Sequence, residues 1–533
     1  MAKRVDMDAM IPRADFATLG DQEFGVGQNL PQDFPLIHLA SNSPIMKILR
    51  KPDFQRETNH WSPEQIVTFI ASFVDGEVIP SLILWKSPKY MFVIDGGHRL
   101  SALRAWMEDD YGDGPISLAF YKGEITDDQR AIAKRTRTLV EKAIGRYSTL
   151  KSYSDPESGA EEKLRRRAHA TITRPLVLQW IISDPSVAET SFFKINSQGT
   201  PLDQTEAMLI KNRLKPIAIA ACAIMRGGSG HKYWSRFTLE RQQGVEAATA
   251  EFNELLFEPE ADVPLKTLDL PLGGSVSPVD ALALLVEFLE IAGSREEGGK
   301  AIDEYDDDPD GEATAKVIRN GIQILNRITG NGRGSLGLHP AVYFYNDRGK
   351  YNKFLFLGMV ALLQDRVRNN DHSFFKKFTF SRKRVEQFLI DNKSLLGIIL
   401  QNLSKGQRVP KMRDLFELLV RKFQDAETLR IEDAIASLGL HGRIVDINAI
   451  QTSSHISDDT KSIVFVRHAI KTALRCPICG GLLDPKKSVT YDHITPVREQ
   501  GTGEADNVQL AHPYCNNSRD SLITVSVEPT LLP

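Results

Sequence analysis

Two pairs of zinc-type ligands lie near the C-terminal end of the sequence. Cys476 and Cys479 form a Cys-x-x-Cys pair, and His512 and Cys515 form a second pair with the same spacing. Thiolates and imidazoles are the ligands of tetrahedral structural zinc, whereas Mg²⁺ takes oxygen ligands. The spacing therefore predicts one structural Zn²⁺ that fastens the two ends of a segment too small to hold itself together.

Residues of a different chemistry lie between and directly after these pairs. Asp492 and His493 stand side by side in YDHITPV, Asn507 follows a glycine-bearing loop, and Asn516 comes directly after Cys515. A neutral imidazole can take a proton from water at neutral pH. A carboxylate and an amide oxygen suit Mg²⁺ and leave it most of its water shell. A zinc knuckle that only binds is the alternative, but it leaves both asparagines without a role.

These residues need a strand and a helix to position them, and their setting resembles a known family. The stretch 470–522 contains the Cys-x-x-Cys knuckle, DHITP, the glycine-bearing loop, NVQLAH and CN, in this order. It resembles the HNH nuclease family, whose ββα-metal fold wraps a two-stranded hairpin and a helix around one catalytic metal. The resemblance implies that His493 is the general base, that Asp492 and Asn516 hold a catalytic Mg²⁺ or Mn²⁺, and that Asn507 steadies the loop and the histidine.

Two positions depart from the commonest form of that family. Asn516 stands where a histidine is commonest, and the second zinc pair is His-x-x-Cys instead of Cys-x-x-Cys. His512 could be mistaken for the family's third catalytic histidine. Its spacing to Cys515 mirrors that of the first pair, so the sequence assigns it to zinc.

A second constellation lies in YMFVIDGGHRLSALRAW, residues 90–106. The pattern predicts a strand, a tight Asp-Gly-Gly turn and a helix. Gly96 and Gly97 would let the backbone approach a ligand closely. The helix N-terminus that follows is a natural anion site, and Arg99 could grip a phosphate there. Such turns are common, so the motif could also be only a turn.

The surrounding sequence resembles the DUF262 form of the ParB/sulfiredoxin-like domain over residues 35–215. The likeness rests on PDFQRETNHWSPEQIVTFIASFVDGEVIPSLILW, VIDGGHRLSAL and FFKINSQGTPLDQTEAMLI, with Gly97 in place of the usual glutamine. It implies a domain that binds, and in many members hydrolyses, a nucleoside triphosphate. The implied nucleotide-facing residues are Asp95, Gly96, His98 and Arg99, with Arg56 and Asn196 as weaker candidates. A remnant of the fold without a nucleotide is the alternative.

The 533 residues, 41% of them hydrophobic, predict an α+β multidomain protein. We expect a ParB/sulfiredoxin-like α/β sensor domain over 1–225, a mostly helical middle region over 226–454, and a ββα-metal HNH domain over 455–533. In the middle region, the acidic DEYDDDPDGE and the glycine-rich GNGRGSLG are predicted to be solvated connections, and LSKGQRVPKMRD (403–414) an exposed basic link.

Net charge and cysteine usage limit the partners and the compartment. The formal net charge is −3, so a nucleic acid must be held by local patches. One candidate is the basic run Lys163, Arg165, Arg166 and Arg167, which could equally be a solvated helix face. No leader-like or membrane-spanning apolar run occurs, and three of the four cysteines cluster as metal ligands. These features predict a cytoplasmic protein without a membrane partner.

The two resemblances together predict a metal-dependent DNA endonuclease controlled by a nucleotide-binding domain. Relatives that couple such domains act in restriction of modified or phage DNA, so we expect DNA and a nucleoside triphosphate as partners; a homo-oligomer is left open. One alternative is a homing-type or nicking nuclease without nucleotide control, which nucleotide binding would distinguish. Another is a non-catalytic DNA-binding regulator with a zinc grip, which metal-dependent plasmid cleavage would exclude.

Overall fold

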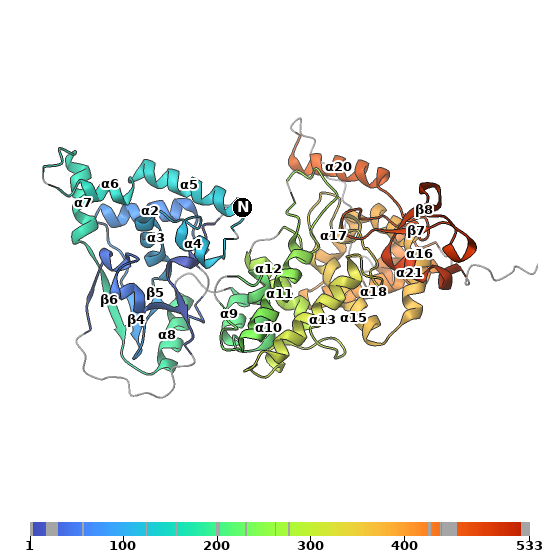
Figure 1. Cartoon of the computed structure of the whole chain (residues 1–533), viewed down its shortest axis with the longest axis horizontal. Helices are drawn as coiled ribbons and strands as arrows, with labels where there is room; N and C mark the ends of the chain where they lie inside the picture. Colours follow the sequence, from blue (N-terminus) through green and yellow to red (C-terminus); the bar gives the residue numbers. More distant parts are fainter. Residues whose placement is uncertain are drawn as a thin grey trace, which may run out of the picture. The chain divides into compact units, whose positions relative to one another are not determined.

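The computed structural model describes residues 4–16, 30–55, 58–123, 125–155, 157–198, 203–229, 232–261, 263–275, 278–424, 428–437, 439 and 456–523. They form two compact units. Unit 1 is Met1–Arg213 with Ser229–Tyr233, and unit 2 is Leu214–Gly228 with Trp234–Pro533 (Figure 1). The expected boundary at 454 lies outside the described residues, and the division into three domains stays a prediction.

Unit 1 is built on a six-stranded sheet with the strand order β1-β3-β5-β4-β6-β2. The strands are β1 Arg13–Ala14, β2 Asp33–Pro35, β3 Leu49–Pro52, β4 Leu82–Lys86, β5 Met91–Asp95 and β6 Pro175–Ile181. Strand β5 is parallel to β3 and antiparallel to β4, and β4 is parallel to β6. Along β5, Met91 and Val93 pack into one core, whereas Phe92 and Ile94 pack into another. Successive strand residues face opposite sides, so the sheet is covered on both faces.

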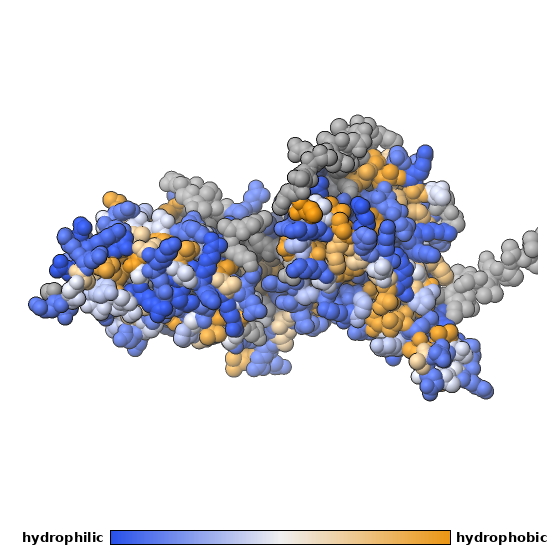
Figure 2. All heavy atoms as spheres, turned by 90° about the horizontal axis from the view of Figure 1, so that it is seen from above, coloured by the Kyte–Doolittle hydropathy of each residue, from blue (hydrophilic) through white to orange (hydrophobic). Residues whose placement is uncertain are grey.

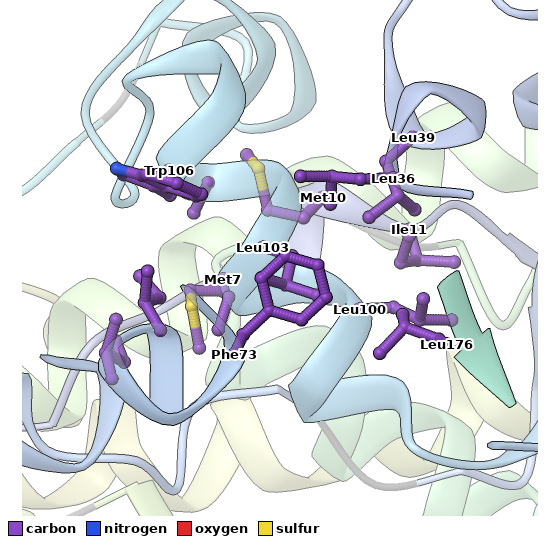
Figure 3. Close-up of a cluster of buried hydrophobic side chains, with 14 of the residues drawn as sticks. Met7, Met10, Ile11, Leu36, Leu39, Phe73, Leu100, Leu103, Trp106 and Leu176 are labelled. Atoms are coloured by element: carbon purple, nitrogen blue, oxygen red, sulfur yellow. The ribbon is translucent and has the colours of Figure 1, made fainter. Parts of the chain in front are cut away.

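The larger core of unit 1 lies between the sheet, helices α2 and α3, and the N-terminal segment. Figure 3 shows Phe73 of α2 and Leu100 and Leu103 of α3 around Met7 and Met10. The helices of this unit are α1 Pro44–Ile48, α2 Pro63–Val74, α3 Gly97–Glu108, α4 Pro115–Phe120, α5 Asp127–Ala143, α6 Tyr147–Ser152, α7 Glu162–Thr173, α8 Pro185–Gln198 and α9 Gln204–Lys211. Two 3₁₀ turns, η1 Asp8–Met10 and η2 Leu36–Leu39, complete it.

Local signals in the sequence set several helix starts of unit 1. Ser62 caps α2 through its side chain and exchanges hydrogen bonds with Gln65, and Pro63 is the first helical residue. Asp203 and Glu206 form a capping box at the start of α9. Each cap satisfies backbone N–H groups that have no partner within the helix. The starts of these two helices are therefore determined by residues close by in the sequence.

Unit 2 is mainly helical. Its helices are α10 Pro216–Met225, α11 Leu239–Phe257, α12 Pro278–Ala292, α13 Glu312–Ile328, α14 Pro340–Tyr343, α15 Lys353–Arg368, α16 His372–Asp391, α17 Lys393–Gln401, α18 Lys405–Gln424, α19 Ile431–Ser437, α20 Asp458–Thr472 and α21 Pro513–Ile523, with the 3₁₀ turn η3 Ile302–Glu304 between α12 and α13. Helix α10 is almost entirely buried and packs against α11, α12 and α13. Helix α18 packs against α15 and α16. The expected fold class, an α/β N-terminal part followed by helices and a small C-terminal sheet, is confirmed.

The basic stretch 403–414 differs from its prediction, whereas the acidic segment is largely exposed, as predicted, with one buried aspartate. Residues 403–414 are not an exposed link, because α18 begins at Lys405 and Met412 is buried against Gly358 of α15. A helix with charged residues on its outer face resembles a basic link in sequence. In the acidic segment, Asp308 is buried and accepts hydrogen bonds from Gly311 N (3.0 Å) and Thr314 N (2.7 Å) at the start of α13.

The outer surface is mixed in character. Hydrophilic side chains cover most of the face drawn in Figure 2, with apolar ones among them. No helix in the described part of the chain combines the length and apolar character needed to cross a bilayer.

Candidate functional site

The four predicted zinc ligands lie together in unit 2. The Sγ atoms of Cys476, Cys479 and Cys515 and a ring nitrogen of His512 are all within 4.8 Å of one another, and all four residues are buried. The first two are in a tight turn, His512 follows strand β8 (Val508–Ala511), and Cys515 is in the first turn of α21. Three thiols and one imidazole at this separation fit structural zinc.

The tautomer of His512 is suited to that metal. Its Nε2 lies 2.9 Å from the carbonyl oxygen of Leu482, which can only accept, so Nε2 carries the proton. The lone pair is then on Nδ1, which lies 3.3 Å from Cys479 Sγ and 3.9 Å from Cys515 Sγ. Burial also lowers the pKa of His512, which keeps the imidazole neutral. A backbone carbonyl that fixes the second ring nitrogen is a usual partner of a zinc-bound histidine.

The three thiols cannot all ionise side by side without a cation. Hydrogen bonds from Cys479 and Cys515 hold the pKa of Cys476 far below its usual range. Burial and the hydrogen bond to Cys476 raise the pKa of Cys479 to about 12. The hydrogen bond to Cys476 likewise raises the pKa of Cys515 well above its ordinary value. A divalent ion would remove this conflict, since metal-bound thiols are thiolates.

A buried ion pair on α16 supports the zinc ligands from outside. Leu482 N–H donates to Glu386 Oε2 at 2.7 Å, and Arg382 Nε donates to Glu386 Oε1 at 2.7 Å. The side chains of Arg382 and Glu386 are 2% and 0% exposed. Arg382 Nη2 also donates to the carbonyl of Gly337 at 2.7 Å. Hydrogen bonds therefore run from His512 through Leu482 to α16 and on to the glycine-rich loop.

The glycine-rich loop is part of this support, contrary to its prediction as a solvated connection. Ser335 is fully buried and its carbonyl accepts a hydrogen bond from Tyr514 N at 2.9 Å. Gly337 has φ +58°, and a Cβ there would meet Cδ2 of His512 at 2.8 Å. A residue at position 337 must adopt a positive φ and leave room for the ring of His512, and only glycine does both without strain. Because His512 and Tyr514 lie more than 170 residues further along the chain, the local composition of this loop could not reveal these contacts.

The predicted hairpin and helix follow the zinc knuckle. Strand β7 (Thr490–His493) is antiparallel to β8, with Asp492 opposite Gln509, and α21 follows β8 directly. The side chain of Asp492 is 9% exposed. Its Oδ2 accepts hydrogen bonds from Gln509 Nε2 at 2.9 Å and Arg519 Nη1 at 3.1 Å. Both donors bind the same oxygen, so Oδ1 is the carboxylate atom left for a cation.

The two predicted asparagines contact β7 and the loop after it. Asn516 Nδ2 donates to the carbonyl of Tyr491 at 3.0 Å, which leaves its Oδ1 as the atom able to bind a metal. Asn507 Oδ1 accepts from Thr495 N at 2.7 Å, and its Nδ2 donates to the carbonyl of Thr502 at 2.7 Å. Asn507 therefore ties together the two ends of the loop between β7 and the 3₁₀ turn η5 (Ala505–Asn507), while a second turn, η4 (Val497–Glu499), lies within it.

His493 ends β7 with a half-buried side chain. The guanidinium of Arg519 donates to its backbone carbonyl and, at 3.1 Å, to the carboxylate of Asp492. One arginine on α21 thus holds the backbone of His493 and the side chain of Asp492 at the same time.

In unit 1, the Asp-Gly-Gly-His-Arg motif connects β5 to α3. Gly96 has φ +99° and precedes the first turn of the helix. Arg99 Nη2 pairs with Asp95 Oδ2 at 2.6 Å, and Arg99 Nη1 donates to the carbonyls of Pro80 and, at 3.2 Å, Ser81. The Arg99 side chain is 12% exposed. Its donors fasten the turn to the neighbouring strand, so a phosphate would have to compete with these contacts.

His98 brings together three stretches that carry the resemblance in this part of the chain. Its ring stacks on Trp61 with centroids 5.7 Å apart and lies 5.9 Å from the ring of His60. His60 Nε2 in turn lies 3.0 Å from Glu206 Oε1 on α9. The weaker candidates lie outside what the structure describes: Arg56 is among the residues not placed, and so is the side chain of Asn196.

Comparison with protein families gives two matches, one in the N-terminal part of the chain and one in the C-terminal part. Residues 38–215 match the family described as GmrSD restriction endonuclease, N-terminal domain, and residues 476–521 match HNH endonuclease. The chain pairs a GmrSD-type domain with an HNH domain. Searches of the curated proteins and of the solved structures gave no match. The pairing supports a restriction-type endonuclease, and the HNH domain implies DNA as the substrate.

The basic run of the GmrSD-type domain is not uniform. Arg167 is buried and makes two hydrogen bonds of 2.6 Å to the carboxylate of Asp75, which keep the pKa of that carboxyl low. Lys163, Arg165 and Arg166 are exposed on α7. Arg167 is thus a structural residue, and the other three retain the interpretation as a solvated face or a DNA contact.

Sequence reasoning missed several residues that support the HNH domain. Gln509 and Arg519 hold Asp492, and Arg382 and Glu386 hold the zinc knuckle. A signal for Arg519 exists, since it lies one helical turn after Asn516 and therefore on the same face of α21. Nothing in the sequence around α16 indicates that its Arg-Glu pair supports a metal site 96 residues further on.

Proposed function

We propose that this chain is a restriction endonuclease whose HNH domain hydrolyses phosphodiester bonds of DNA under the control of a nucleotide bound by its GmrSD-type domain. The observation that carries the proposal is the arrangement at β7. There, Asp492 and His493 end the strand, and Asn516 of α21 bonds to the same strand through its amide nitrogen. These are a carboxylate, an imidazole and an amide oxygen within one hairpin and helix.

The side chains fit a catalytic divalent ion at this position. Asp492 Oδ1 and Asn516 Oδ1 are the oxygens that the hydrogen bonds leave available, and hard oxygens suit Mg²⁺ or Mn²⁺. When bound, such an ion supplies positive charge to the phosphate and to the departing 3′-oxygen. Zinc belongs to the separate cysteine-rich site, where its function is structural.

We assign proton removal to His493. Its imidazole takes a proton from a water molecule, whose oxygen forms a bond to phosphorus while the bond from phosphorus to the 3′-oxygen breaks. The leaving oxygen then takes up a proton from solvent. Asn507 has a positioning role, because its amide ties the loop that follows His493.

The nucleotide control is assigned to the turn after β5. Asp95, Gly96, His98 and Arg99 would face the nucleotide, with the helix N-terminus of α3 as an anion site. Support comes from the match to the GmrSD restriction endonucleases and from the packing of His98 on Trp61. We further propose foreign or modified phage DNA as the target, in keeping with a restriction function.

The test is cleavage of modified and unmodified plasmid DNA by the full chain. Reactions contain Mg²⁺ or Mn²⁺ and either no nucleotide or one nucleoside triphosphate, and nicked and linear products are measured on gels. We expect cleavage that requires the divalent ion and depends on the nucleotide. Cleavage at the same rate without any nucleotide would remove the control and leave the nuclease.

His493→Ala should slow this cleavage by about 10²–10⁴-fold, the usual contribution of a general base. His169→Ala is the matched control, because His169 is exposed on α7 of unit 1, outside the HNH domain. Zinc content and thermal unfolding of both variants should equal those of the wild type. Wild-type rates in His493→Ala would overturn the assignment of the base.

A further inference from the structure

Helix α16 has one face inside unit 2 and another in solvent. Arg382 and Glu386 point inward to the zinc knuckle. Lys376, Phe380 and Lys383 lie at spacings of four and three residues, which places them on one stripe of the helix. Lys383 is exposed, Phe380 is 45% exposed and Lys376 is half-buried. The outward stripe therefore carries two ammonium groups and an aromatic ring.

The zinc knuckle continues this basic stripe. A Cβ on Gly480 would meet side-chain carbons of Lys383 at 2.9–3.1 Å, so the stem of Lys383 lies over the residue that directly follows the zinc ligand Cys479. Arg475 Nη1 donates to the carbonyl of the same Gly480 at 3.2 Å. Lys471, in the last turn of α20, lies four residues before Arg475 and is exposed. Lys383 and Arg475 therefore lie at the same turn, and Lys471 is exposed at the end of the helix that leads into it.

Acidic residues do not interrupt this surface in sequence. Residues 460–483 contain no Asp or Glu, and neither do residues 372–385 of α16. Within the described residues, no ion pair joins Lys376, Lys383 or Lys471 to a carboxylate. In a chain with a net charge of −3, such a surface is a local exception.

The parts of this surface hold a fixed geometry. Leu482 N–H of the knuckle and Arg382 Nε of α16 both donate to the buried carboxylate of Glu386, so a hydrogen bond to a charged acceptor that solvent does not screen joins the knuckle to α16. Surface lysines on separate mobile segments would lose entropy when they bind one partner. Cations on a rigid support lose less, which favours binding of a regular polyanion.

We propose that Lys376, Lys383, Arg475 and Lys471 form a DNA-backbone contact surface shared between the middle region and the zinc knuckle. The inference rests on the proposed nuclease function and assigns α16, which no family match covers, to substrate binding. Duplex DNA is the partner that the charge favours, because it presents a dense and regular row of phosphates. Base contacts are not required, so this surface contributes affinity and not sequence preference.

The test measures binding of a short fluorescent DNA duplex to the full chain, by anisotropy, over a series of salt concentrations without added Mg²⁺. Lys383→Gln/Lys471→Gln removes one cation from α16 and one from α20. Since each lost phosphate contact reduces the salt slope by about 0.9, the slope of log K against log salt should become shallower by about 2. Affinity near 0.15 M salt should fall by roughly tenfold or more, equally for unrelated DNA sequences.

Lys316→Gln/Arg319→Gln is the matched control. It removes the same charge from exposed positions of α13, which packs with α10, α11 and α12. This control should retain the wild-type slope, and both variants should retain their zinc and their unfolding temperature. A wild-type slope in Lys383→Gln/Lys471→Gln, or an equal loss in the control, would overturn the proposed surface.

The outcomes separate this inference from the nuclease assignment. If the wild type cuts and binds DNA and the double variant does so equally well, only the contact surface fails. If the wild type neither binds nor cuts DNA, the nuclease assignment fails with it. If Lys383→Gln/Lys471→Gln keeps wild-type binding of the DNA duplex but loses binding of an acidic protein segment, the surface is a protein interface and the proposal is wrong.

Discussion

Asp492 is held by donors from two different elements, Gln509 on the partner strand and Arg519 on α21. Both donate to Oδ2, which fixes the orientation of the carboxylate before any metal binds. Arg519 also binds the backbone carbonyls of His493 and Ile494. We therefore interpret Arg519 as a positioning residue that keeps Oδ1 of Asp492 available to a cation.

Arg519→Ala should weaken divalent-ion binding, because Oδ2 of Asp492 loses one of the two donors that fix its orientation. Loss of such an outer contact costs about 10–100-fold in metal affinity. Calorimetric titration of the full chain with Mn²⁺ measures the affinity directly, and a Mg²⁺ series in the cleavage assay should show a higher half-saturating concentration. Arg498→Ala, a change of the same type at an exposed residue, is the control. An unchanged Mn²⁺ affinity in Arg519→Ala would contradict the positioning role.

Helix α16 contributes to the metal centre through a pair whose charges are removed from solvent. Burial disfavours the charge of Arg382, but Glu386 more than offsets it and raises the pKa of Arg382 above its ordinary value. Arg382 remains a cation, and its Nε pairs with Glu386 Oε1 at 2.7 Å. Removing one partner of such a pair leaves a buried charge without compensation.

Glu386→Gln should lower the free energy of unfolding of unit 2 by about 3–5 kcal/mol, because Arg382 loses its counter-ion. The shape of the side chain is retained, so the effect reports the charge. Zinc release to a chelator should also become faster, since Leu482 N–H loses its charged acceptor next to the carbonyl that orients His512. Gln387→Glu, one residue further and exposed, is the control. Equal stability of Glu386→Gln and the wild type would exclude the supporting role.

At the scale of elements, the sequence predicts features that depend on neighbouring residues, but not contacts between residues far apart in the chain. Ser62 and Asp203 mark the starts of α2 and α9, because an N-cap residue bonds to backbone groups within the next four residues. The zinc-ligand pairs are predicted by their spacing, whereas the roles of Asp492 and His493 are implied by the resemblance to HNH nucleases and stay a prediction. The support from Glu386 and Ser335 depends on partners far along the chain, so composition suggested a solvated loop where the structure has a buried one.

The whole molecule contains two units that each bury their own apolar core. Unit 1 has its sheet covered on both faces, and unit 2 has the helices around α10 together with the zinc knuckle. Units with separate cores generally unfold separately. The zinc belongs to unit 2 alone, so metal removal can distinguish the two transitions.

Scanning calorimetry of the full chain should therefore show two transitions, and a chelator should lower only one of them. Cys476→Ser should reproduce the effect of the chelator, because three ligands hold zinc less tightly than four. Metal analysis of the wild type should give one zinc per chain. Cys222→Ser is the control, since Cys222 lies outside the ligand cluster. A chelator that lowers both transitions equally would show that the units do not unfold separately.

The contact at Gly337 restricts replacement of this HNH domain by the HNH domain of another protein. Its missing side chain leaves room for the ring of His512, and Ser488 lies close by on the same side. A chimaera that replaces only residues 476–521 would pack a foreign zinc knuckle against a glycine-rich loop that fits the original knuckle. The glycine-rich loop and the zinc knuckle therefore have to come from the same parent, so crossovers between residue 337 and the knuckle should give recombinants that fold poorly.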